Sequence, residues 1–556
     1  MGVVYLPAPH SISAEITVLS QFGRVSSTLP MTRTKRTRPP MSLIWLVALV
    51  MVAAEEARAQ TITAASATAA TIERFVLGPP VNSNCHEVAP VITPDGRALF
   101  FHRFNHPENV GGVDGGEDIW MAVLGADGEW SRPMNVGPPL NTPGNNFVTS
   151  VSPDGAILYL GNVYREDGSM SGGLSVACRT PAGWSLPQTV QIDRYRNTST
   201  QTYFALAPDG RTMIMEIDNP ESMGLDDLFV SFILPDGTWS RPVNLGPVVN
   251  TPGREITPYI AADGRTLYFS SDYRGGMGDQ DVYMTRRLDD TWLEWSQPVN
   301  LGSIVNTTGW DAYFTLPSSG AYAYLVNYVD TVRNSDIVRV SVPTEYRPYP
   351  TVVVRGRVYD VTTGKALGGL VQHTGIDRGG LSGRCGADSA RGAYSIVLTP
   401  GHRYELFAEV DGYLSMGEHV DLRDISVSAE LNIDIPMAPI RAGVVFVPSA
   451  LYFDFARADL RTEAHRDIDR VQEMMVLHPT MIVEIRGHTD SVGADEPNYV
   501  LSLDRASAVA ERLQALGIET SRIAIAGSGR SQPRSSNRST GGRQLNRRVE
   551  FTIVQE

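Results

Sequence analysis

Gly487-His488-Thr489-Asp490-Ser491-Val492-Gly493 is a polar segment that separates two stretches of regular pattern. Residues 481–485 before it are mainly apolar and have the length of one short strand. From about Pro497 onward the pattern has helical spacing. The glycines at both ends of the polar segment favour a loop, so the sequence predicts a loop that joins this strand to this helix.

Polar side chains of the predicted helix share the face nearest this loop. Asn498, Ser502 and Arg505 recur at spacings of three or four residues, which places them one above another. Asp490 in the loop and Arg505 on the helix therefore form a candidate pair of opposite charges. Taken alone, such a pair is more typical of a structural salt bridge on a solvated surface.

The flanking sequence predicts an α/β domain over residues 445–556. Residues 451–455 have the pattern of a short strand, and residues 460–477 carry an apolar stripe on a predicted helix that ends at a His-Pro pair. Further strands are expected near residues 523–525 and at the C-terminal end.

Four short motifs of this region occur together in the order and spacing of a known module. They are Gly-His-Thr-Asp at 487–490, Asn498, Leu-Ser-x-x-Arg-Ala at 501–506 and Asn-Arg-Arg-Val at 546–549. On these motifs, the region resembles the OmpA-like peptidoglycan-binding domain, which is also found in the peptidoglycan-associated lipoprotein and in motor stator proteins. One departure is Arg530, where the family usually has Glu.

The resemblance implies a module that binds diaminopimelate in the stem peptide of peptidoglycan. Diaminopimelate presents an ammonium and a carboxylate on one carbon, so its site needs an anion and a cation at a fixed separation. Asp490 is expected to take the ammonium, and Arg505 is expected to bind the carboxylate with its planar guanidinium. Thr489, Asn498 and Arg548 are expected to orient this pair or to bind nearby carbonyls.

A different pattern fills residues 73–343. An Asp-Gly turn, or a close variant of it, recurs at intervals of roughly 55 residues and precedes an apolar run each time. The turn glycines are Gly96, Gly155, Gly210, Gly264 and Gly320. Further markers are the aspartates Asp118, Asp227, Asp281 and Asp336 and the Trp-Ser pairs at Trp130, Trp184, Trp239 and Trp295. Each unit predicts a four-stranded sheet with a tight hairpin, in which Trp packs between neighbouring sheets.

These repeats resemble the WD40-like repeats of the Tol-system periplasmic β-propeller, and the five turns imply five blades. A closing strand is also expected, because residues 77–82 match the segment that follows each Trp but precede the first repeat. The strand around Phe75 can then complete the last blade. The recurring aspartates are expected to cap turns rather than to bind metal.

Residues 350–437 have the alternating pattern of a small β-sandwich. Strand patterns occur at 352–358, 392–396 and 404–408. The region resembles the carboxypeptidase-regulatory-like sandwich, and this resemblance implies a spacer or presentation domain without catalytic residues.

The N-terminus has the features of an export signal. Basic residues between 33 and 38 precede an apolar run over 43–54, and an Ala-x-Ala pattern ends at Ala59. Residues 1–59 are therefore predicted to be an N-terminal extension and signal peptide. Export would place the mature chain in the periplasm, associated with the cell wall and the outer membrane.

Charge and composition restrict the function further. The formal net charge of -14 argues against a general nucleic-acid binder, and the three cysteines show no metal-binding spacing. No cofactor is expected. The combined prediction is a non-catalytic scaffold that binds peptidoglycan at its C-terminal end and presents the propeller to an envelope protein or a glycan.

The alternative is a wall-tethered glycosidase with carboxylates in the funnel of the propeller. Candidate carboxylates are Glu87, Glu255 and Asp311. Glu87 and Glu255 occupy similar places before a turn, and a repeated position favours structure over catalysis. His488 has the chemistry of a general base, but no nucleophile accompanies it, so a structural role in the loop is the better interpretation.

Overall fold

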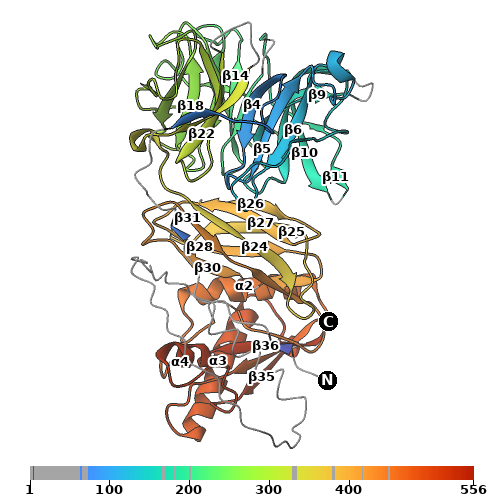
Figure 1. Cartoon of the computed structure of the whole chain (residues 1–556). Helices are drawn as coiled ribbons and strands as arrows, with labels where there is room; N and C mark the ends of the chain where they lie inside the picture. The colour runs from blue at the N-terminus through green and yellow to red at the C-terminus, as the bar shows by residue number, and fades with distance from the viewer. Residues whose placement is uncertain are drawn as a thin grey trace, which may run out of the picture.

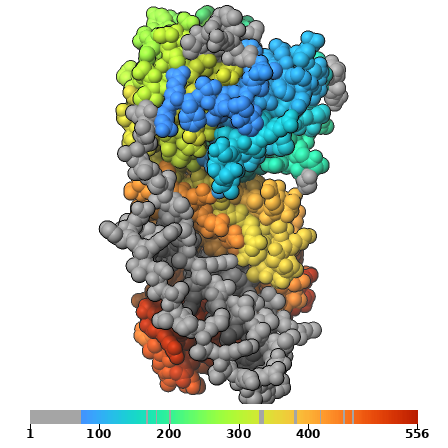
Figure 2. Space-filling view, viewed as in Figure 1, coloured from blue at the N-terminus to red at the C-terminus, as the bar shows by residue number. Residues whose placement is uncertain are grey.

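The structure is a computed structural model that describes residues 4–5, 63–64, 73–165, 169–180, 182–199, 202–328, 335–377, 382–415, 417–448 and 451–556. A group of sheets lies at one end of the molecule, a pair of sheets in the middle and an α/β domain at the other end (Figure 1). The space-filling view has the same order (Figure 2). The predicted signal peptide lies outside the described residues, apart from Val4–Tyr5.

Five sheets cover the region of the repeats. Their strands are β4 (His86–Ile92), β5 (Ala98–Phe104), β6 (Glu117–Val123) and β7 (Met134–Asn135); β8 (Phe147–Val151), β9 (Ile157–Tyr164), β10 (Met170–Thr180), β11 (Gly183–Trp184) and β12 (Gln188–Thr189); β13 (Phe204–Leu206), β14 (Thr212–Ile217), β15 (Asp227–Phe232) and β16 (Val243–Asn244); β17 (Glu255–Ile260), β18 (Thr266–Ser271), β19 (Asp281–Arg286) and β20 (Val299–Asn300); and β21 (Trp310–Thr315), β22 (Tyr322–Tyr328), β23 (Asp336–Ser341) and β3 (Arg74–Val76).

The repeated turns lie between the first and second strand of each sheet. All five turn glycines have positive φ angles, which other residues adopt at a cost. Where Asp precedes the glycine, its side chain caps the turn: Asp95 Oδ1, for example, accepts hydrogen bonds from Thr93 Oγ1 at 2.5 Å and from the Arg97 amide at 2.9 Å. The predicted hairpins are therefore confirmed.

The first strands of the five sheets contact one another in a closed cycle. β4 contacts β8, β8 contacts β13, β13 contacts β17, β17 contacts β21, and β21 returns to β4. These strands line a small axial cavity of about 60 Å³. Trp239 and Trp295 are buried in apolar clusters, as predicted for the Trp positions.

The N-terminal strand completes the last sheet. β3 pairs antiparallel with β23, and Phe75 lies opposite Arg339. Just beyond it, the Asn82 side chain accepts from the Ile337 amide and donates to the Ile337 carbonyl, both at 3.0 Å. Asn250 makes the same two bonds to Leu228 within the chain of repeats. The predicted closing strand is therefore confirmed.

Two sheets in the middle of the molecule enclose one apolar core. One contains β2 (Thr63–Ala64), β24 (Val352–Asp360), β27 (Ala393–Leu398), β29 (Tyr413–Ser415), β31 (Ala429–Asn432) and β32 (Ile435–Pro439); the other contains β25 (Gly369–Gly375), β26 (Ser382–Ala387), β28 (Arg403–Glu409) and β30 (Glu418–Asp421). The region therefore has two layers of sheet, as a sandwich requires.

The Asp-Gly turns of the five-sheet region face this sandwich. Arg355 of β24 lies 3.3 Å from the carboxylate of Asp95, and the Gly386 amide donates to Asp154 at 2.9 Å. The Tyr349 amide donates to Asp263 at 2.8 Å. The opposite end of the five-sheet region therefore points away from the sandwich (Figure 1).

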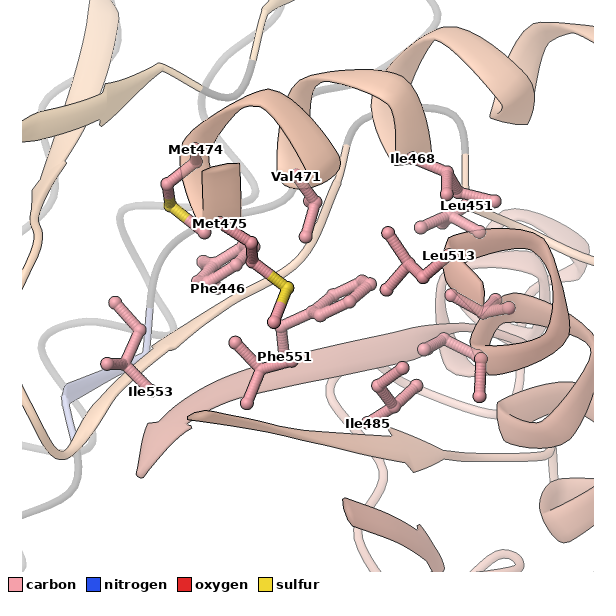
Figure 3. Close-up of a cluster of buried hydrophobic side chains, with 14 of the residues drawn as sticks. Phe446, Leu451, Ile468, Val471, Met474, Met475, Ile485, Leu513, Phe551 and Ile553 are labelled. Carbon is pink, nitrogen blue, oxygen red and sulfur yellow. The ribbon is translucent and has the colours of Figure 1, made fainter. Parts of the chain in front are cut away.

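The C-terminal domain is one sheet covered by two long helices. Its strands are β1 (Val4–Tyr5), β33 (Val444–Phe446), β34 (Ile482–Gly487), β35 (Ile523–Gly527) and β36 (Val549–Gln555), and its helices are α2 (Thr462–Leu477), α3 (Asp495–Ala515) and α4 (Thr540–Asn546). Figure 3 shows Val471 and Met475 of α2 above the sheet residues Phe446 and Phe551, with Leu513 of α3 beside them. The predicted helix over 460–477 and the predicted strand over 481–485 are confirmed.

The prediction of a strand at 451–455 is wrong. Tyr452 forms only an isolated bridge to Arg548, and Phe455 is exposed. Leu451 and Phe453 turn into the core instead, and the backbone reverses at Ala456, which has a φ of 56°. The alternation of apolar residues led to the wrong prediction, because the segment is too short to pair with a neighbouring strand along its length.

Among the described residues, no helix combines the length and apolarity needed to cross a membrane.

Candidate functional site

The polar loop lies where β34 ends and α3 begins, and neighbouring strands fix its backbone. The His488 amide donates to the Arg548 carbonyl, and the Thr489 amide donates to the Gly529 carbonyl, both at 2.9 Å. The loop therefore begins in a fixed position beside the residues that precede β36.

Asp490 is 3% exposed, and both of its carboxylate oxygens are engaged. Oδ1 accepts a hydrogen bond from the Val492 amide at 2.9 Å. Oδ2 accepts one from Arg547 Nη1 at 2.8 Å, a charge-assisted contact. The partner of Asp490 in this structure is thus Arg547.

Arg505 is fully buried under the same loop. Its guanidinium donates to the carbonyls of His488, Arg457 and Asp454, at 2.8, 2.9 and 3.1 Å. Burial and the nearby charge of Arg547 lower the pKa of Arg505 to about 10, so the side chain stays charged at neutral pH, and the charge of Asp490 opposes this shift. Since a guanidinium has five N–H donors, these bonds leave an N–H on each terminal nitrogen.

Two further predicted residues lie at the loop. Asn498 Nδ2 donates to the carbonyls of Val492 and Ala494, both at 3.0 Å, and so holds the loop against the start of α3. The Thr489 hydroxyl is buried and makes no hydrogen bond to any described residue. A buried hydroxyl without a partner is uncommon, and it leaves a polar atom available to a ligand.

Arg548 points away from Asp490 into the domain. Its Nε donates to Glu550 Oε1 at 2.8 Å, and Nη2 contacts the same oxygen. His488 is fully buried, with Nε2 3.3 Å from Glu550 Oε2. The structural interpretation of His488 agrees with this burial, which also lowers its pKa.

Arg530 lies against the outer side of the loop. It forms an ion pair with Asp495 at the start of α3, and its Nη1 donates to the Gly493 carbonyl at 3.2 Å. The residue that departs from the family pattern therefore contacts the loop that carries Asp490, although it does not contact Asp490 itself.

Arg547 was not among the site residues predicted from the sequence. Successive residues of an extended segment point to opposite sides, so the side chains of Arg547 and Arg548 point in different directions and have different partners. The Asn-Arg-Arg motif indicates that one arginine faces the loop, but only the structure shows which one.

Comparisons with known proteins identify the domain that carries this loop. A family model described as the OmpA family matches residues 452–547. The C-terminal domain is OmpA-like.

Relatives match short stretches of this chain. Outer membrane porin F of Pseudomonas aeruginosa is 36% identical over 129 residues, which are 23% of this chain and 37% of that protein. The peptidoglycan-binding protein ArfA of Mycobacterium bovis is 38% identical over 86 residues, 16% of this chain and 26% of that protein. The chain thus spans little more than a third of the first of these relatives.

Among solved structures, the peptidoglycan-associated lipoprotein from Burkholderia pseudomallei is 25% identical. That match covers 18% of this chain and 86% of the other, with a TM-score of 0.18.

The candidate catalytic carboxylates of the five-sheet region share one structural role. Glu87, Glu255 and Asp311 each accept a hydrogen bond from the amide four residues earlier, at 3.0, 2.7 and 2.6 Å. The hydroxyls of Ser83, Thr251 and Thr307 bond to the same carboxylates. Three copies of one capping contact indicate a structural position rather than an acid–base pair.

The recurring aspartates also close turns. Asp118 Oδ2 accepts hydrogen bonds from the Val110 amide at 2.6 Å and from Asn135 at 2.7 Å. Asp227 makes the same pair of contacts with Met223 and Asn244, both at 2.7 Å. The prediction that these residues cap turns is confirmed for these two repeats.

Proposed function

We propose that this chain is a non-catalytic scaffold of the cell envelope that binds peptidoglycan through its OmpA-like domain. The observation that carries the proposal is Asp490 beside the partly buried Arg547 and the buried Arg505, in a loop whose domain matches the OmpA family. The name of the Mycobacterium bovis relative supports the ligand, because that protein is a peptidoglycan-binding one. The name of porin F supports a place at the outer membrane and the adjoining periplasm.

Diaminopimelate has the charges that this site requires. Its ammonium replaces Arg547 on Asp490, and its carboxylate binds Arg505 together with the released Arg547. The Thr489 hydroxyl bonds to a neighbouring group of the stem peptide. Each charge-assisted bond contributes about 1.5–3 kcal/mol.

Asn498 and Arg548 position the loop rather than touch the ligand in this proposal. Asn498 fixes the turn after Asp490 through its two carbonyl contacts. Arg548 supports the loop from behind, because its carbonyl accepts the His488 amide.

The remaining regions present a surface to a partner. The closed cycle of five sheets is a five-bladed WD40-like β-propeller over residues 73–343, and residues 350–437 are a carboxypeptidase-regulatory-like spacer. One end of the propeller points away from the OmpA-like domain (Figure 1). A wall-bound chain therefore offers that end to an envelope protein or a glycan.

Calorimetry with two soluble stem peptides tests the ligand assignment. One peptide contains diaminopimelate, and the other contains lysine, which keeps the side-chain ammonium but lacks the adjoining carboxylate. The proposal predicts at least about tenfold tighter binding of the diaminopimelate peptide, since the arginine contacts require the carboxylate. Equal affinities would refute the role of the arginines.

A further inference from the structure

The last sheet of the five-sheet region differs from three others in one contact. In those three sheets, an aspartate near the start of the third strand accepts a hydrogen bond from an asparagine of the fourth strand. The bonds run from Asn135 to Asp118 at 2.7 Å, from Asn244 to Asp227 at 2.7 Å and from Asn300 to Asp281 at 3.0 Å. Asp336 of β23 is the corresponding aspartate of the last sheet, whose fourth strand is the closing strand β3.

The closing strand carries Val76 at the place of the asparagine. Asn300 lies opposite Tyr283 in the fourth sheet, and Val76 lies opposite Val338 in the last sheet. Both Tyr283 and Val338 come two residues after the aspartate of their strand. Because valine has no side-chain amide, this donor is missing, and Asp336 accepts no hydrogen bond from any residue that the structure describes.

The asparagine has a second partner in the same three sheets. Its Oδ1 accepts the backbone amide of Gly137, Gly246 or Gly302, each at 2.8 Å. One side-chain amide therefore bridges a carboxylate and a backbone amide in each sheet. Gly78 is the corresponding glycine of the closing segment, and its amide has no acceptor within the described part of the chain.

The backbone around these two unpaired groups keeps the geometry of the other sheets. The Leu77 amide donates to the Ile337 carbonyl at 3.0 Å, and the corresponding bond from Leu245 to Leu228 in the third sheet has the same length. The unpaired amide and the unpaired carboxylate each belong to the residue next to one end of this bond. They are therefore placed as in the sheets where one amide group spans them.

A groove of about 700 Å³ gives access to both groups, because Val76, Gly78 and Asp336 all line it. Val76 is itself 54% exposed. Burial raises the pKa of Asp336, and the nearby His86 opposes this shift. Asp336 lies at the start of β23, at the end of the five-sheet region opposite the turns that face the sandwich. A partner can therefore reach the groove without displacing the sandwich.

The other sheets indicate which chemical group fits. Besides its bond to the aspartate, Nδ2 of Asn135 donates to the Glu108 carbonyl at 3.0 Å, and Nδ2 of Asn244 donates to the Glu221 carbonyl at 3.3 Å. The group is thus a primary carboxamide, with two N–H donors on one nitrogen and an adjoining oxygen acceptor. An ammonium group has no acceptor for a glycine amide, and an N-acetylated sugar has only one N–H on a substituted nitrogen.

We propose that Val76, Gly78 and Asp336 form a binding site for the side-chain carboxamide of an Asn or Gln residue in a partner protein. The carboxamide nitrogen donates to Asp336, and the carboxamide oxygen accepts the Gly78 amide. The partner then supplies the contact that an asparagine of the chain makes in three other sheets. The inference rests on the proposed function in treating the five-sheet region as the surface that a partner binds. Its tests contain no peptidoglycan, so their failure would leave the wall-binding proposal standing.

Substitutions at residue 76 test the missing contact within the chain. Val76→Asn supplies the amide from β3 and should raise the thermal transition of the full chain, because Asp336 and Gly78 both gain a partner. Val76→Asp is the matched control, since it has the same shape but no N–H donor, and its carboxylate repels that of Asp336. Val76→Asn should therefore melt well above Val76→Asp; equal melting of the two variants would overturn the proposal.

Saturation-transfer NMR on the full chain tests the ligand. The probes are three acetylated tripeptide methylamides with asparagine, glutamine or leucine between two alanines, and N-acetylglucosamine. At least one of the two carboxamide peptides should bind saturably, and the leucine peptide and the sugar should not. The proposal is overturned if neither carboxamide peptide binds, or if the leucine peptide or the sugar binds as well as they do.

Variants then locate the binding. Asp336→Leu should weaken it at least about tenfold, because the carboxylate acceptor is lost. Leucine is tolerated at this place in the repeat, since Leu174 occupies it in the second sheet. Val76→Asn should weaken binding by at least as much, because its own amide takes both partners of the ligand. Unchanged affinity in both variants would show that the peptide binds elsewhere and would overturn the proposal.

Discussion

Asp490 Oδ2 accepts a hydrogen bond from Arg547 at 2.8 Å, so the carboxylate assigned to the ligand already has a cationic partner. Arg505, the other predicted ligand residue, bonds instead to three backbone carbonyls. In the proposed complex the ligand ammonium therefore competes with Arg547 for Asp490. Arg547 pairs with Asp490 in the free protein, whereas Arg505 holds the backbone of the loop.

Arg547→Gln tests whether Arg547 binds the ligand. The substitution removes one charge-assisted contact to the ligand carboxylate, so affinity for a diaminopimelate stem peptide should fall about tenfold. Calorimetry on the full chain measures this. Tighter binding by the variant would mean that Arg547 only blocks Asp490 and does not hold the ligand.

Arg505→Gln should destabilise the loop as well as weaken binding. The change removes the donors of three buried or part-buried carbonyls, at a cost of about 3 kcal/mol or more. Hydrogen–deuterium exchange of the full chain should then show faster exchange at residues 488–494 and in the first turns of α3. Unchanged exchange together with lost binding would instead make Arg505 a pure ligand residue.

Glu405 and Arg470 join the sandwich to α2 at 2.6 Å, and Glu405 is 3% exposed on β28. Arg470→Met removes the nearest cation of this buried carboxylate and leaves it with Arg466 at 3.8 Å and His419 at 3.5 Å, so the change should cost about 3 kcal/mol. The thermal transition of the full chain should fall accordingly. Arg512→Met is the control, because Arg512 pairs with Asp469 near the surface, and its effect should stay below about 1 kcal/mol.

The same pair predicts a loss of stability in acid. Burial alone would raise the pKa of Glu405, but the hydrogen bonds and charges of His419 and Arg470 outweigh it and lower the pKa to about 2. A lowered pKa in the folded state stabilises above the unfolded value of about 4.3, and the contribution disappears as the pH falls toward 2. Glu405→Gln should therefore flatten the pH dependence of melting over this window; an unchanged curve would contradict the assignment.

Asn82→Ala tests closure of the five-sheet cycle. The substitution leaves the buried Ile337 amide unpaired and removes one of two donors to its carbonyl, which still accepts from the Leu77 amide, so it should cost about 1–3 kcal/mol. Asn250→Ala removes the equivalent contacts at Leu228 and should cost a similar amount. Thermal melting compares the two. A neutral Asn82→Ala beside a costly Asn250→Ala would mean that the N-terminal segment does not close the cycle.

Repeated and periodic features could be predicted well from the sequence. The positive-φ glycines marked all five hairpins, and the match between residues 77–82 and the segments after each Trp revealed the closing strand. The predicted helix over 460–477 agrees with α2 (Thr462–Leu477) because its apolar stripe has a clear period.

Partners chosen by tertiary packing could not be predicted in the same way. Whether Arg547 or Arg548 faces Asp490 depends on how the segment before β36 docks on the sheet, which neither spacing nor residue type determines. The wrong strand at 451–455 has the same origin, because its apolar residues fill the core without pairing.

Co-sedimentation with purified sacculi tests the central claim most directly. The mature chain should sediment with the sacculi, and Asp490→Asn should weaken this binding at least about tenfold, because the amide cannot form an ion pair with the ligand ammonium. Asp504→Asn is the matched control, since Asp504 is exposed on α3 next to Arg505 in sequence, and it should bind as the wild type does. If the wild type stays in the supernatant, or if Asp490→Asn sediments as the wild type does, the peptidoglycan-binding account is wrong.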